Sequence, residues 1–207
     1  MTTFVAAIAF LVLGFGLGRL HRGLSSNQGE AAVRRLLSTH FESASYHLLN
    51  NVTLPVDDGT TQIDHILVSR FGVFVIETKH YKGWLFANSG PKWTQVLFGK
   101  HYKFQNPILQ NTKHVRAVSK LLDFVEPSAV RSLVVFTGDG VFKSQRPDGV
   151  LALSEVTPFF ANFNEEVLSE NRVQFCVGRL ECTRRRLSRQ TDIEHVEYLT
   201  RKFGPVD

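Results

Sequence analysis

The chain has 207 residues, a formal net charge of +5, 43% hydrophobic residues and two cysteines. Two cysteines in a chain of this length exclude a disulfide framework and favour a reducing compartment. The hydrophobic content is enough for one soluble domain of about 180 residues, and 17 Phe make its core rich in aromatic side chains.

An apolar run opens the chain, since Thr2–Gly18 carries no charged residue. A helix of this length spans about 26 Å at 1.5 Å per residue, slightly short of a hydrocarbon core of ~30 Å. Arg19, His21 and Arg22 follow at once, and positive charge marks the cytoplasmic side. We therefore expect residues 1–23 to be a single-pass anchor in the inner or plasma membrane, with the soluble domain in the cytoplasm. A cleaved signal peptide is the competing interpretation, but neither a preceding basic region nor a small-residue cleavage site is visible.

The soluble part is predicted to be α/β. Its first half should contain a helix at 29–40, a strand at 46–54, a turn at 57–59, and strands at 62–69 and 72–79 joined by a tight turn. Three short antiparallel strands follow at 83–85, 92–96 and 100–104, then a helix from about 106 to 124 with Pro at its first turn. Strands at 131–137 and 150–153 and helices at 155–163 and 192–203 complete the prediction.

The two strands at 62–69 and 72–79 are almost continuously apolar, which indicates that both faces of the sheet are covered. Acidic residues in such strands are costly unless a positive charge compensates them. Glu77 and Lys79 share one strand face, because side chains alternate. Asp64 lies on the neighbouring strand and can meet them across the hairpin.

Two carboxylates and a phosphate are ligands that suit Mg²⁺ (or Mn²⁺), so Asp64 and Glu77 are predicted metal ligands. The ion can acidify a bound water and offset charge on a scissile phosphate. Lys79 can orient or deprotonate that water, or stabilise the transition state electrostatically. The alternative is purely structural: Glu77 and Lys79 simply neutralise each other.

Positive charge is concentrated after these residues. From Lys79 to Leu122 there is no Asp or Glu, against eight Lys and Arg. In this segment cations interleave with aromatic residues, around Trp84 and Trp93 and again at 100–104. Such a segment suits phosphate contacts and base stacking, and predicts nucleic acid, above all DNA, as the partner. A solvated basic face without a partner is the alternative.

Several ordered motifs resemble one known family. They are Gly29-Glu30, the run from Gln62 to Val68, the run from Gly72 to Lys79, Gly83, and Asn106-Pro107-x-x-Gln110. Together they resemble the nuclease-related domain, NERD, a branch of the PD-(D/E)XK nuclease superfamily. The resemblance covers about residues 27–124. It implies a restriction-endonuclease-like mixed β-sheet flanked by helices.

The resemblance also implies roles. Asp64 and Glu77 would hold the metal with Lys79 beside them, and Glu30 would be a further acidic member of the catalytic site. Gln110 would be a polar position on the helix after the basic segment, where it shares one face with Lys113 and His114. The predicted substrate-binding residues are Gln110, Lys113, His114, Lys82, Lys92 and Lys103. Ile63 stands where the superfamily often has Pro.

Two weaker patterns favour structural interpretations. Cys176, Cys182 and His195 lack a fourth zinc ligand at a sensible spacing, so we expect the cysteines to be hydrophobic residues. His65 points away from Asp64's strand face and is predicted to be packed and hydrogen-bonded.

The resulting hypothesis is a membrane-anchored, metal-dependent nuclease that hydrolyses phosphodiester bonds of DNA, or of RNA, without a small-molecule cofactor. We expect an anchor at 1–23, a nuclease-related domain at 24–137 and an α/β extension of the same domain at 138–207. Two other readings stay open. One is a catalytically silent nucleic-acid-binding or interaction module at the membrane; the other is a scaffold whose basic face meets lipid headgroups.

Overall fold

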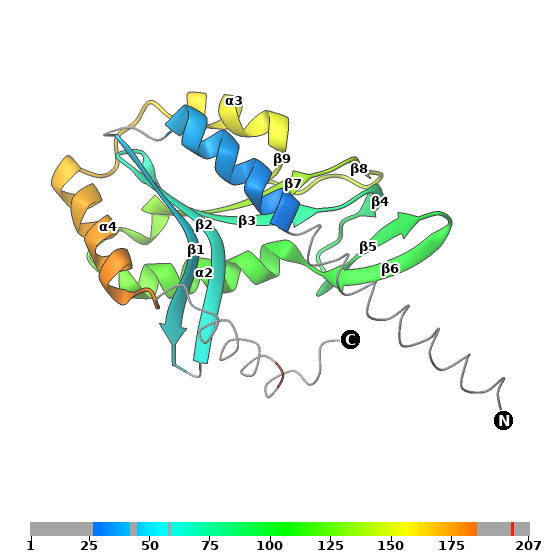
Figure 1. Cartoon of the computed structure of the whole chain (residues 1–207), viewed down its shortest axis with the longest axis horizontal. Helices are drawn as coiled ribbons and strands as arrows, with labels where there is room; N and C mark the ends of the chain where they lie inside the picture. Colours follow the sequence, from blue (N-terminus) through cyan, green and yellow to red (C-terminus); the bar gives the residue numbers. More distant parts are fainter. Residues whose placement is uncertain (1–26, 42–44, 58, 186–199, 201–207) are drawn as a thin grey trace, which may run out of the picture.

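A computed structural model describes residues 27–41, 45–57, 59–185 and 200. In these residues the chain forms an α/β fold with two mixed sheets flanked by helices (Figure 1). The predicted anchor at 1–23 and, apart from residue 200, the helix predicted at 192–203 lie outside them. No helix within the described ranges combines the length and apolar character needed to cross a membrane.

The larger sheet has five strands in the order β1-β2-β3-β7-β9. Their bounds are β1 Tyr46–Val56, β2 Gly59–Ser69, β3 Gly72–His80, β7 Val130–Thr137 and β9 Val150–Ala152. β1, β2 and β3 are antiparallel neighbours, whereas β3, β7 and β9 run parallel. The apolar run of β3 is buried from Gly72 to Thr78, so the expectation that both sheet faces are covered is confirmed.

The smaller sheet has the order β6-β5-β4-β8. Its strands are β4 Gly83–Phe86, β5 Lys92–Leu97, β6 Lys100–Gln105 and β8 Gly140–Phe142. The predicted antiparallel extension is confirmed for β4, β5 and β6, and β8 adds a parallel strand beside β4. β3 leads into β4 and β7 into β8, so the smaller sheet continues from the ends of two central strands (Figure 1).

Helices cover both faces of the larger sheet. The helix at residues 27–41 and α3 (Val156–Ala161) pack on one face around Phe74. The helices α2 (Pro107–Leu121) and α4 (Glu170–Thr183) pack on the other. Short 3₁₀ turns, η1 (Pro127–Ala129) and η2 (Leu153–Glu155), precede β7 and α3.

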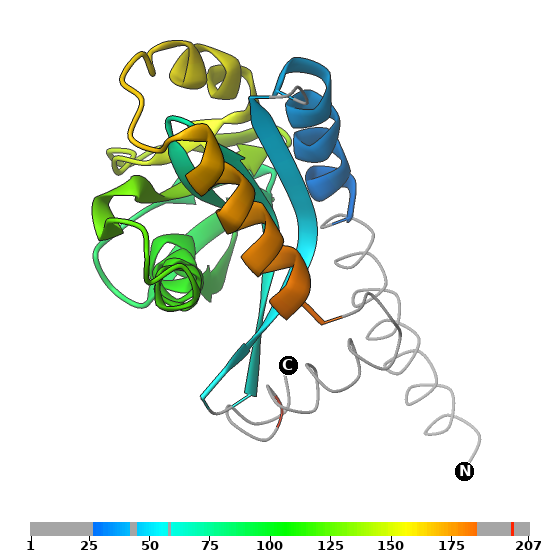
Figure 2. The same ribbon diagram turned by 90° about the vertical axis from the view of Figure 1, so that its left-hand side faces the viewer.

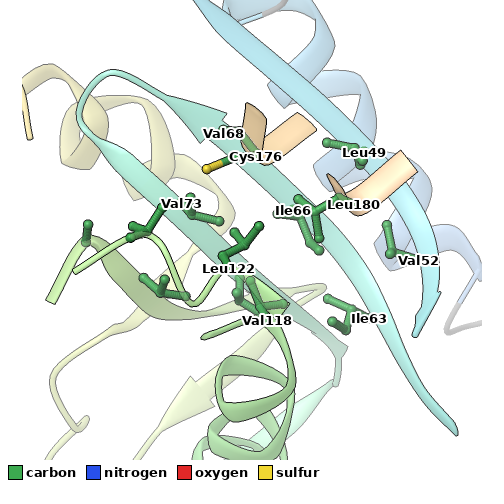
Figure 3. Packing of buried hydrophobic residues seen from close by; sticks show 14 of the residues in the cluster. Leu49, Val52, Ile63, Ile66, Val68, Val73, Val118, Leu122, Cys176 and Leu180 are labelled. Carbon is green, nitrogen blue, oxygen red and sulfur yellow. The ribbon is translucent and has the colours of Figure 1, made fainter. Parts of the chain in front are cut away.

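The helix α4 was missing from the sequence prediction. Only Val173, Cys176 and Leu180 of its residues are buried, a narrow stripe in an otherwise polar segment. Cys176 and Leu180 lie over β1 and β2 (Figure 3), and Val173 belongs to the same core cluster. Cys176 is therefore a core residue, as expected, and burial raises its pKa to about 11. Cys182 was also expected to be a buried hydrophobic residue, but it is exposed, so that prediction is wrong.

Side-chain alternation shifts at one point in the paired strands β1 and β2. Leu49 and Val52 belong to the same core cluster, although strict alternation would place them on opposite faces. Ile63 and Ile66 on β2 behave in the same way. Asn51 lies at the shift with φ of 50°, a left-handed conformation that Asn tolerates better than most residues. The ribbon of β1 and β2 extends beyond the rest of the sheet from here (Figures 1 and 2).

Gly29 allows the helix at 27–41 to approach the ends of β3 and β7. A Cβ atom at this position would lie 2.7 Å from Oγ1 of Thr137 and 2.9 Å from Cβ of His80. Both atoms are held close to the backbone and cannot swing away. This close approach places Glu30, the next residue, beside the end of β3.

Substitution by alanine should change the stability of the protein in opposite directions at two helical glycines, Gly29 and Gly178. Gly29→Ala should lower the free energy of unfolding by about 1–3 kcal/mol, because the added methyl group overpacks the contact. Gly178→Ala on α4 is the matched control, since a Cβ there meets nothing within 4 Å. It should raise stability by about 0.5–1 kcal/mol through helix propensity. Urea unfolding measures both changes, and equal effects of one sign would contradict the packing.

Candidate active site

Strands β2 and β3 stop pairing where the predicted acidic residues begin. Their antiparallel ladder runs from Ser69↔Gly72 to His65↔Ile76 and ends there. Asp64 is the next residue of β2, and its Oδ2 accepts a hydrogen bond of 2.7 Å from the backbone N–H of Thr78. The Asp64 side chain thus accepts the hydrogen bond that a backbone carbonyl group of the neighbouring strand would otherwise accept. The two strands diverge around the Asp64 carboxylate.

Glu77 and Lys79 lie together on the same face of β3, as alternation predicts. Nζ of Lys79 donates to Oε1 of Glu77 in a short ion-paired hydrogen bond. The Glu77 side chain is 2% exposed and that of Lys79 20%, so the pair sits below the surface with Lys79 nearer to solvent. The structural alternative, in which Glu77 and Lys79 neutralise each other, therefore corresponds to an ion pair in the structure.

The second oxygen of Glu77 faces the helix α2. Nε2 of His114 lies 3.2 Å from Oε2 of Glu77, an ionic contact if the imidazole is protonated. Neither atom makes an aligned hydrogen bond among the described residues. On its other side His114 shares a hydrogen bond of 2.7 Å between Nδ1 and Oγ1 of Thr61 on β2. His114 thus belongs to the acidic cluster, whereas the sequence predicted a place on a substrate-binding face.

Asn111, one turn before His114, holds α2 against the sheet. Its Nδ2 lies 2.8 Å from the carbonyl oxygen of Val75, 2.8 Å from Oγ of Ser132 and 3.1 Å from the carbonyl oxygen of Leu133. These contacts join the helix to β3 and β7 at once. Sequence reasoning missed this residue. Its signal was a polar side chain on an apolar stripe, three residues after Ile108 and seven before Val118.

Charge and burial separate the two carboxylates. Burial raises the pKa of Asp64 well above its usual value, and the charges of Glu77 and Glu30 raise it further. Burial also works to raise the pKa of Glu77, but Lys79 and His114 outweigh it and the net shift is downward. Burial works to lower the pKa of Lys79, but Glu77 and Asp64 outweigh it and the net shift is upward. At neutral pH the cluster therefore holds a charged Glu77–Lys79 pair. The surroundings of Asp64 disfavour a negative charge on its carboxyl group.

Glu30 approaches this cluster from the helix at residues 27–41. It lines a cavity of about 280 Å³ together with Asn27, Ala31, Arg34, Asn50, Asn51 and His65. Because Glu30 also raises the pKa of Asp64, the cavity is adjacent to the acidic residues. The expectation for His65 is confirmed: it is buried and its Nδ1 lies 2.6 Å from Oδ1 of Asn50. Burial, with Arg34 nearby, lowers its pKa to about 4.

The remaining predicted substrate-binding residues spread over the helix α2, the residue before β4, and the strands β5 and β6. Gln110 is half-buried and Lys113 exposed on α2. Lys82 precedes β4, while Lys92 and Lys103 lie on β5 and β6, and all three are exposed. Lys103 Nζ donates to Oγ1 of Thr94.

The donor set of the cluster suits a hard divalent cation. Among the residues that the structure describes, no three ligand-type side chains already form a metal cage. Mg²⁺, however, is commonly held by one or two carboxylates together with waters and substrate phosphate. Oε2 of Glu77 is a buried oxygen without an aligned hydrogen-bond donor among the described residues. The raised pKa of Asp64 indicates that its surroundings disfavour the negative charge. Asp64 and Glu77 therefore fit Mg²⁺ or Mn²⁺ as ligands.

Comparisons with known proteins agree with the location of this cluster. A family model described as the nuclease-related domain, NERD, matches residues 25–137. An uncharacterized protein from Bacillus anthracis is 33% identical over 182 residues, which cover 85% of this chain and 84% of that protein. Glu30, Asp64, Glu77, Lys79 and His114 all fall within the matched residues.

Removing the charge of Asp64 should stabilise the fold. In chelator at neutral pH, Asp64→Asn should raise the free energy of unfolding by about 1 kcal/mol, a usual size for relieving active-site strain. A raised folded-state pKa destabilises above that pKa, and the penalty disappears as pH falls toward the usual value of 3.8. The difference between variant and parent should therefore shrink with falling pH.

Urea unfolding between pH 4 and 8 measures this difference. Asp123→Asn is the matched control, because Asp123 is exposed and lies outside the acidic cluster. A destabilised Asp64→Asn variant at neutral pH would contradict the assigned strain.

Proposed function

This chain belongs to the nuclease-related domain family, part of the PD-(D/E)XK-like nuclease superfamily, and from that membership we propose that it is a metal-dependent nuclease. It hydrolyses phosphodiester bonds of DNA, or of RNA, with water as the nucleophile. One observation carries the proposal: the half-buried carboxylate of Asp64 and the buried carboxylate of Glu77 interact electrostatically where β2 and β3 diverge, with Lys79 beside them.

The fold is proposed to be restriction-endonuclease-like. Its mixed sheet, covered by helices on both faces, agrees with that architecture. Residues 24–137 form the nuclease-related domain in this proposal. Residues 138–207 complete the same domain, in keeping with the pairing of β9 with β7 and the packing of α4 on β1 and β2.

The roles of individual residues follow from their environments. Asp64 and Glu77 hold Mg²⁺ or Mn²⁺, which supplies charge that offsets the charge developing on the scissile phosphate. Lys79 acts as a fixed cation rather than a general base, because its raised pKa keeps it protonated at neutral pH. Lysines in this state stabilise developing negative charge.

The remaining members of the cluster position these groups. His114 contacts Glu77 and so orients its carboxylate toward the strand divergence. Glu30 adds negative charge on the helix side, which strengthens the attraction for a cation near Asp64. Lys82, Lys92, Lys103, Lys113 and Gln110 contact substrate from the surrounding surface.

In this proposal the domain is held at the inner or plasma membrane by residues 1–23, on its cytoplasmic side. The uncharged run from Thr2 to Gly18, followed by Arg19 and Arg22, supports this part.

A catalytically silent binding module is the second candidate. The observation that favours it is the internal compensation of Glu77, whose charge meets Lys79 and His114 without a metal. The raised pKa of Asp64 argues the other way, since its carboxylate gains no comparable partner and accepts only one backbone hydrogen bond in the described structure.

Cleavage assays separate the two candidates. The full-length protein is incubated with plasmid, single-stranded DNA and RNA in Mg²⁺, Mn²⁺ or chelator. Cleavage should require metal, and Asp64→Ala and Lys79→Ala should each lower the rate by at least about 100-fold. Asp123→Ala, an exposed carboxylate, is the control and should cleave normally. Binding without cleavage in any metal would contradict the enzyme and favour the silent module.

A further inference from the structure

The hairpin of β5 and β6 carries an exposed aromatic residue at its tip. Its turn consists of Phe98 and Gly99, with φ of 51° and 74°. Two positive φ angles define the turn that best suits a hairpin, and Asn-Gly is its usual sequence. Phe98 is 94% exposed, so the protein gains no packing from it. A bulky side chain in a left-handed conformation costs energy, and the described part of the chain offers Phe98 no packing that would offset this cost.

One face of the smaller sheet is also largely uncovered among the residues that the structure describes. The opposite face packs Leu85, Trp93 and Phe142 into a core cluster. On the uncovered face, strand register places Trp84 next to Val96 and Val141, and Val96 next to His101. Trp84 is 54% exposed and Val141 52%.

Cations lie among these apolar side chains. Nζ of Lys143 lies 5.2 Å from the centre of the Trp84 ring, a cation–π contact. Lys103 shares the face with Trp84, since its partner Thr94 pairs with Phe86 two residues along β4. None of the four strands contains an acidic residue. We call Trp84, Phe98, His101, Lys103, Val141 and Lys143 the stacking surface.

The smaller sheet, which carries the stacking surface, follows directly on the strand of Glu77 and Lys79. β4 begins three residues after β3 ends, and Lys79 is the penultimate residue of β3. The smaller sheet lies at the end of the molecule toward which β3 runs (Figure 1).

Cations interleaved with exposed aromatic rings bind single strands, whose phosphates meet the cations while their bases stack on the rings. A duplex keeps its base faces stacked on each other and offers no such contact. We propose that the stacking surface binds unpaired nucleobases, so that the substrate is single-stranded nucleic acid or a single-stranded region next to a duplex. This inference rests on the proposed nuclease function and specifies its substrate class.

A lipid surface fits the same residues less well. Membrane-binding elements separate an apolar face from a basic face. Here Lys143 lies over the ring of Trp84, and Lys103 shares its sheet face. Burying Trp84 in acyl chains would bury these charges too.

The test measures binding without cleavage. Full-length protein in chelator is titrated into a labelled single strand and its duplex, with fluorescence anisotropy as the readout. Single strands should bind about tenfold more tightly than the duplex. Phe98→Asn and Trp84→Ala should each weaken single-strand binding about fivefold or more, the size of one lost base stack. Quenching of 2-aminopurine in the strand should fall in parallel.

Two features keep this test independent of folding. Phe98→Asn puts the residue that the turn prefers at its position, so its melting temperature should equal or exceed that of the parent. Phe175→Ala is the matched control, because Phe175 is 72% exposed but lies on α4, outside the stacking surface. It should bind single strands normally.

Three results would overturn the inference. The first is unchanged single-strand binding in both Phe98→Asn and Trp84→Ala, and the second is equal affinity for single strand and duplex. The third is binding only to vesicles of equal parts phosphatidylcholine and phosphatidylserine, weakened by the same two substitutions. If single strands bind through this surface but metal never produces cleavage, the nuclease proposal fails and the binding surface stands. If metal-dependent cleavage occurs while the variants bind normally, the nuclease stands and this inference fails.

Discussion

The end of the β2–β3 ladder is the constraint on which the site depends. Backbone groups in a buried sheet must be paired, and past His65↔Ile76 the Asp64 carboxylate takes over that task from a neighbouring strand by accepting from Thr78. The strands therefore separate without leaving this N–H unsatisfied. The separation leaves the Asp64 carboxylate within electrostatic reach of Glu77, in surroundings that raise its pKa. The same bond that preserves the sheet creates an electrostatic strain that a cation can relieve.

The surrounding elements maintain this arrangement from both faces. Asn111 ties α2 to β3 and β7, and this register sets His114 against Glu77. On the opposite face, the absence of a side chain at Gly29 allows the first described helix to bring Glu30 near Asp64. Several buried polar side chains, among them Glu77, Thr78 and Thr137, lie near the end of β3 where the smaller sheet begins.

Local pattern was sufficient to predict the strands β2 and β3 and the shared strand face of Glu77 and Lys79, because both signals lie within one short segment. The apolar runs of β2 and β3 and the alternation of Glu77 and Lys79 need no distant information. The role of His114 could not be predicted this way, since it depends on how α2 rotates against strands more than thirty residues away. The helix α4 was missed because three buried side chains give a weak periodic signal. Glu30 was proposed only from resemblance, and its effect on Asp64 depends on the close approach at Gly29.

Metal binding itself tests the central claim most directly. Electron paramagnetic resonance of Mn²⁺ titrated into the full-length protein counts bound ions without any substrate or turnover. The account predicts one bound ion that Asp64→Asn abolishes, with Asp123→Asn binding normally. An unchanged titration in Asp64→Asn, or no bound Mn²⁺ in the parent protein, would contradict the assignment of this strand divergence as a cation site.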